Sequence, residues 1–76
     1  MKPEPFRVGI EESQLEDLAG RLEATRWARD FENDDWRYGT NGAYLRELVD
    51  YWRSGYDWRA QERAINCYDQ FRVVID

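Results

Sequence analysis

The chain has 76 residues, a formal net charge of −5 and no histidine. This length suits one small domain, which we place at residues 1–76. The absence of histidine excludes the catalytic sets that pair a serine or cysteine nucleophile with an imidazole. The single cysteine, Cys67, allows no intrachain disulfide and argues against a conventional zinc site.

Composition narrows the class of protein further. Hydrophobic residues make up 42% of the chain and charged residues 36%, which is too apolar for a disordered chain. No run approaches the roughly 20 apolar residues of a membrane span, and the first five residues lack the apolar stretch of a signal peptide. We therefore expect a cytoplasmic protein. The acidic balance argues against nucleic acid as a partner, because phosphates require clustered lysine and arginine.

The first element predicted in the chain is a short strand at Phe6–Ile10, where apolar and other residues alternate. A similar pattern at Phe71–Ile75 predicts a second strand near the other end. The two strands could pair with each other, or the second could join a different sheet. The sequence leaves both arrangements open.

The first predicted helix begins at Ser13, where Ser13 and Glu16 have the spacing of a capping box, or slightly earlier at Glu11. It is expected to run to about Trp27. Its apolar stripe has the spacing i, i+3, i+4, i+7. The stripe consists of Leu15, Leu18, Ala19 and Leu22.

A polar loop with several aromatic residues is expected from Asp30 to Thr40, followed by a helix capped by Asn41. Gly55 fits the left-handed position after this helix, and Asp57 is expected to cap a third helix that ends near Asn66 or Cys67. The predicted fold is thus mainly α, a small three-helix domain with two short terminal strands. Its expected core consists of Leu18, Leu22, Leu45, Leu48, Val49, Trp52 and Ile65.

No spacing of acidic residues selects a catalytic or metal-binding site. Asp30, Glu32 and Asp34 resemble the first ligands of a calcium loop, but Asp35 stands where such a loop needs glycine and Asn41 where it needs glutamate. An Asp-Arg-Asp set could open an epoxide without histidine, yet no trio here is singled out. We therefore predict no catalytic, cofactor-binding or metal-binding residue, and no turnover by the chain alone.

Several aromatic blocks, in this order, resemble the N-terminal segment of epoxide hydrolases of the microsomal type. The matching blocks are Phe6–Val8, Leu15–Leu22, Ala24–Trp27, Trp36–Gly39, Tyr44–Trp52, Tyr56–Arg59 and Gln70–Phe71. The resemblance implies a segment that packs on an α/β-hydrolase body and its lid. It also implies that Phe71–Asp76 begins the first strand of that body. The family's catalytic residues lie beyond the matching part, so none is assigned to this chain.

Aromatic residues make up 16% of the chain, with four Trp, five Tyr and three Phe. A thin three-helix core cannot enclose twelve rings, so some are expected at an interface, where Trp, Tyr and Arg are enriched. The expected contact set is Trp36, Arg37, Tyr38 and Tyr44, and its partner is a hydrolase body or a second copy of the chain. The alternative is a self-contained small interaction or ligand-binding protein that uses the exposed aromatics.

Overall fold

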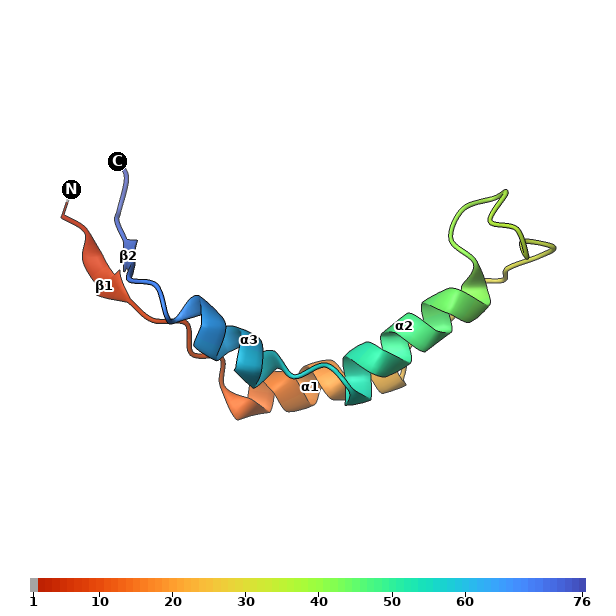
Figure 1. The fold of residues 1–76 in the computed structure, drawn as a ribbon, viewed down its shortest axis with the longest axis horizontal. Helices are drawn as coiled ribbons and strands as arrows, with labels where there is room; N and C mark the ends of the chain where they lie inside the picture. The colour runs from red at the N-terminus through yellow and green to blue at the C-terminus, as the bar shows by residue number, and fades with distance from the viewer. Residues whose placement is uncertain (1) are drawn as a thin grey trace. The chain divides into compact units, whose positions relative to one another are not determined.

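The computed structural model describes residues 2–76 and contains three helices and two strands (Figure 1). In chain order they are β1 (Glu4–Phe6), α1 (Glu12–Glu23), α2 (Gly42–Ser54), α3 (Trp58–Ile65) and β2 (Gln70–Arg72). The predicted fold class is confirmed. The contacts divide into two compact units: one contains β1, α3 and β2, and the other runs from Glu12 to Tyr56 with α1 and α2.

In the first unit, β1 and β2 pair antiparallel, as one of the two predicted arrangements requires. Opposite residues are Glu4 and Arg72, Pro5 and Phe71, and Phe6 and Gln70. Both strands are shorter than predicted and begin earlier, so the residues after Phe6 and after Arg72 lie outside the sheet.

The segment after β1 leaves the sheet because side chains at the end of α3 bind its backbone. The Val8 N–H donates to Asn66 Oδ1 at 2.9 Å, and Asn66 Nδ2 donates to the Val8 carbonyl at 2.8 Å. One helical turn earlier, Glu62 Oε2 accepts from the Ile10 N–H at 2.8 Å. An amide and a carboxylate thus take the place of a partner strand. The hydrogen bond from Ile10 and the pairing with Arg59 lower the pKa of Glu62.

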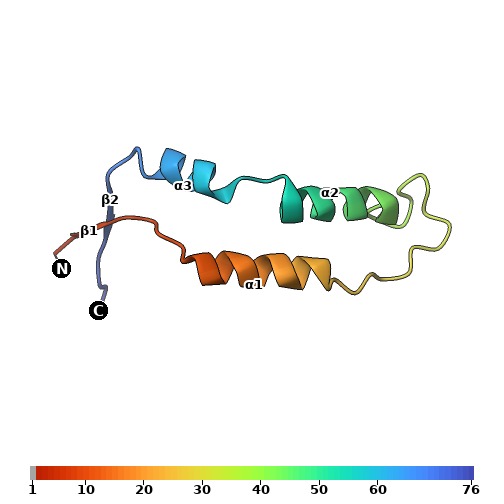
Figure 2. The same cartoon turned by 90° about the horizontal axis from the view of Figure 1, so that it is seen from below.

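In the second unit, α1 and α2 run antiparallel and side by side (Figure 2). The predicted α1 stripe is confirmed: Leu15, Leu18, Ala19 and Leu22 are its half-buried residues. The boundaries were predicted less well. The helix begins at Glu12, so Ser13 lies in the first turn and the capping-box prediction is wrong.

The α1 helix also ends before the predicted Trp27. Its last residue is Glu23, and the Thr25 hydroxyl donates to the Leu22 carbonyl at 2.6 Å. A threonine side chain that binds a nearby carbonyl competes with the helical backbone bonds, which accounts for the early end.

The caps of the other helices follow the sequence closely. Asn41 Oδ1 accepts from the Tyr44 N–H at 2.9 Å, and Asp57 Oδ1 accepts from the Ala60 N–H at 3.1 Å. Gly55 does follow α2, but its φ of −108° is not left-handed, so that part of the prediction is wrong. Glycine is needed there for a different reason, since a Cβ would lie 2.8 Å from the Tyr51 ring.

The predicted single core is wrong. No apolar side chain between residues 2 and 76 is buried; Leu18, Leu22 and Val49 are half-buried, and the other four predicted members are exposed. Ile65 belongs to the other compact unit. Two antiparallel helices share only one seam, so each covers one face of the other and leaves the rest open.

Among residues 2–76, none of the helices has the length and hydrophobicity that a membrane span requires.

Candidate docking surface

The loop before α2 is organised around the side chain of Asn33. Its Nδ2 donates to the carbonyls of Gly39 at 3.1 Å and Thr40 at 3.2 Å, and its Oδ1 accepts from the Tyr38 N–H at 2.9 Å. The Asn33 carbonyl accepts from Asn41 Nδ2 at 3.0 Å. These bonds close the loop on itself and tie it to the residue that caps α2.

A second tie joins the loop to the first turn of α2. Asp30 Oδ2 accepts a hydrogen bond from the Gly42 N–H. A Cβ on Gly42 would lie 2.7 Å from this oxygen, so the close approach requires glycine. The helix start is therefore satisfied by two side chains of its own chain, Asp30 and Asn41.

The loop holds Trp36 against the first turn of α2. Trp36 has a positive φ of 66°, a left-handed conformation that is costly for a bulky residue. Its ring centroid lies 5.2 Å from that of Tyr44, with the planes tilted by 55°. The two residues remain 48% and 50% exposed, so the pair presents a partly open aromatic surface.

The other two predicted interface residues lie next to this pair in sequence. Arg37 Nε and Nη2 bind the carboxylate of Asp35, at 3.1 Å and 2.9 Å, and the guanidinium lies 6.0 Å from the Tyr38 ring centroid. Arg37 lowers the pKa of Asp35, so this carboxyl is no candidate general acid. All four predicted residues are exposed, and Trp36 and Tyr44 are in contact.

The exposed apolar surface continues along α2 beyond the predicted residues. Leu48, Tyr51 and Trp52 follow Tyr44 at i+4, i+7 and i+8 and are all exposed. We call Tyr44, Leu48, Tyr51 and Trp52 the α2 face. The sequence had assigned Leu48 and Trp52 to the core. The signal for an outer face was the presence of Tyr44 and Tyr51 beside the apolar stripe, which makes the stripe wider than one helix contact can cover.

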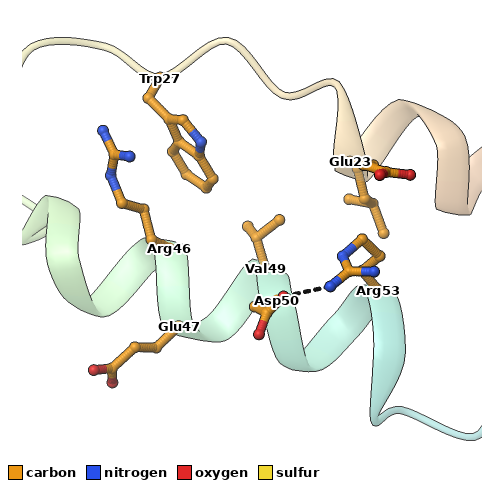
Figure 3. Close-up of a pocket in the computed structure, with 8 residues that line it drawn as sticks. Glu23, Trp27, Arg46, Glu47, Val49, Asp50 and Arg53 are labelled. Carbon is orange, nitrogen blue, oxygen red and sulfur yellow. Dashed lines mark hydrogen bonds and ion pairs between the residues drawn. The ribbon is translucent and has the colours of Figure 1, made fainter.

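A groove of about 490 Å³ lies between α1 and α2 (Figure 3). Arg46 lies over the Trp27 ring at 5.1 Å from its centroid, and Arg53 Nη2 pairs with Asp50 Oδ1 at 2.7 Å. Asp50 raises the pKa of Arg53. Three of the charged side chains that line the groove, Arg46, Asp50 and Arg53, are thus already engaged. The groove is also lined by the apolar side chains of Leu22 and Val49.

These contacts form an exposed surface of aromatic and apolar side chains. In the part of the chain that the structure describes, no three histidine, cysteine or acidic side chains are placed to hold a metal ion. Two carboxylates of the loop are engaged, Asp35 by Arg37 and Asp30 by the start of α2. The arrangement offers an aromatic loop held by the hydrogen bonds of Asn33, next to an exposed apolar helix face.

Comparison with known proteins identifies the family to which this chain belongs. Residues 3–76 match the family described as epoxide hydrolase N terminus. A Stigmatella aurantiaca protein named as a candidate epoxide hydrolase is 42% identical over 72 residues, which cover 95% of this chain and 16% of that protein. Epoxide hydrolase 1 of Sus scrofa is 35% identical, with the same coverage.

The solved structure of the Aspergillus niger epoxide hydrolase matches with a TM-score of 0.88 and 32% identity, over 100% of this chain and 20% of that one. The chain spans about one sixth of the length of these curated relatives. It corresponds to the N-terminal domain of such enzymes, and the homologous domain sits within a larger chain. The chain belongs to the epoxide hydrolase N terminus family.

Proposed function

We propose that this chain is a non-catalytic N-terminal domain that packs on an α/β-hydrolase body and its lid and stabilises them. The observation that carries the proposal is the α2 face, an exposed row of large apolar side chains in a chain without a buried apolar core between residues 2 and 76. Contiguous apolar surface of this kind is unfavourable in water and marks interaction sites. Its burial against a body supplies the core that the helices lack.

The size of the relatives supports a body as the partner. Most of the length of the Aspergillus niger enzyme lies outside the part that this chain matches. A domain that is built into a longer chain can leave one face apolar, because the rest of the chain covers it. Self-association through the same face is the competing outcome.

The segment after β2 supports the same partner. Val73, Val74 and Ile75 are consecutive and exposed, the last two at 80% and 77%. Neighbouring side chains on an extended segment point to opposite sides, so three apolar residues in a row are typical of a strand that is buried on both faces. We infer that this segment joins the sheet of the hydrolase body.

A chimeric enzyme tests the proposal. The matching segment of the Aspergillus niger epoxide hydrolase is replaced by this chain, and epoxide hydrolysis and thermal unfolding are measured with and without Leu48→Glu. Leu48→Glu places a charge in the proposed contact and should lower both the midpoint temperature of thermal unfolding and the rate of epoxide hydrolysis. Ala43→Glu adds the same charge to α2 outside the α2 face and should change neither. Equal behaviour of the two variants would contradict the proposal.

A further inference from the structure

Asn33 is the most buried residue between positions 2 and 76, with 3% of its surface exposed. Burial of an amide is costly unless its polar atoms are hydrogen-bonded. Here both Nδ2 donor positions and Oδ1 are used, by Gly39, Thr40 and Tyr38. The loop is therefore built around a polar centre, in a unit that has no buried apolar one.

The bonds of Asn33 determine where the Trp36 ring lies. The Asn33 carbonyl accepts from the Trp36 N–H at 3.3 Å, and the Trp36 carbonyl accepts from the Gly39 N–H at 3.0 Å. Gly39 is itself held by Asn33 Nδ2 and has a positive φ of 117°. A tryptophan in an unconstrained loop seldom adopts a left-handed conformation, so the position of the indole depends on this set of bonds.

We propose that Asn33 is a positioning residue that pre-forms the loop from Glu32 to Asn41, so that Trp36 meets the hydrolase body in its final geometry. This inference rests on the proposed function. The partner is the hydrolase body, because the relatives carry the matching domain in a chain that is several times longer. A preformed loop avoids the entropic cost of ordering on binding. The apparent affinity equals the intrinsic affinity multiplied by the fraction of free chains whose loop is already in the binding conformation.

The test uses the chimeric enzyme, folded as a complete chain and then cleaved at a protease site inserted after Asp76. The affinity of the cleaved segment for the body is measured by size-exclusion chromatography over a dilution series. Asn33→Ala should lower this affinity on the order of tenfold, as expected if about a tenth of free loops keep the binding conformation. Asn33→Asp keeps the acceptor for Tyr38 but places a carboxylate oxygen against the carbonyls of Gly39 and Thr40, and should lower the affinity at least as much.

A double-mutant cycle separates positioning from a general structural role. If Asn33 acts through the indole, Asn33→Ala should change the affinity less than about twofold once Trp36→Ala is present. In the intact 76-residue chain, Asn33→Ala should also speed exchange of the Tyr38 amide while leaving the helical circular dichroism unchanged.

Two kinds of result would contradict the proposal, and they can be told apart. A tenfold loss of affinity by Asn33→Ala that persists in the Trp36→Ala background would overturn the positioning role. So would an unchanged affinity, or a Tyr38 amide that already exchanges freely in the wild-type chain. Immediate loss of the wild-type segment after cleavage would overturn the proposed function, and this inference with it.

Discussion

Replacement of Trp36 by alanine should weaken docking on the hydrolase body strongly. A tryptophan side chain can bury up to about 250 Å². With 48% of Trp36 exposed, about 120 Å² of ring remains to be covered by a partner. At about 25 cal/mol per Å², full coverage is worth about 3 kcal/mol, and a central interface residue typically contributes at least about 2 kcal/mol. The expected loss of affinity is therefore about 30- to 160-fold.

The assay is release of the cleaved segment from the chimeric enzyme, with Trp36→Phe as the matched control that keeps an aromatic ring next to Tyr44. Trp36→Phe should retain most of the affinity. The free chain should lose some helical stability with Trp36→Ala, because half of the ring already contacts its own unit. Release that is unchanged by Trp36→Ala, or equally fast with Trp36→Phe, would refute the reasoning. So would a Trp36→Ala chain that simply unfolds, because the ring would then serve the chain's own structure.

Three further predictions can be tested on the isolated chain. Asn66→Ala should free the backbone of Val8, and faster exchange of the Val8 amide with an unchanged Phe6 amide would report it. The pKa of Glu62 is lowered from 4.5, so its bonds stabilise the folded unit above that pH and are lost as the pH falls through the lowered pKa. The Ile10 amide shift should therefore move on acidification below about 4.5 and not in Glu62→Gln, whereas movement in both would contradict it. The pure chain should not hydrolyse epoxides, and turnover that a single aspartate substitution abolishes would show otherwise.

The features that the sequence predicted are those set by neighbouring residues. The caps at Asn41 and Asp57 each involve an N–H three residues ahead, and the α1 stripe depends only on helical spacing. Such short-range signals are visible in a single sequence. The pairing of β1 with β2 could be stated only as one of two options, because it depends on which other strands are available.

The features that were missed depend on distant partners. The predicted strand at Phe6–Ile10 stops at Phe6 because Glu62 and Asn66 bind residues more than 50 positions away. Nothing in the spacing of Asn33 singled it out as the buried centre of the loop. The core was placed wrongly because the sequence cannot tell whether an apolar stripe faces the same chain or a partner.

Oxidative footprinting of the aromatic rings tests the central claim most directly. Hydroxyl radicals label exposed Trp and Tyr, and labelling of Trp36, Tyr44, Tyr51 and Trp52 is compared between the isolated chain and the chimeric enzyme. If the α2 face and its loop dock on the hydrolase body, these four rings should be labelled several-fold less in the chimera. Equal labelling of the four rings in both proteins would contradict the account.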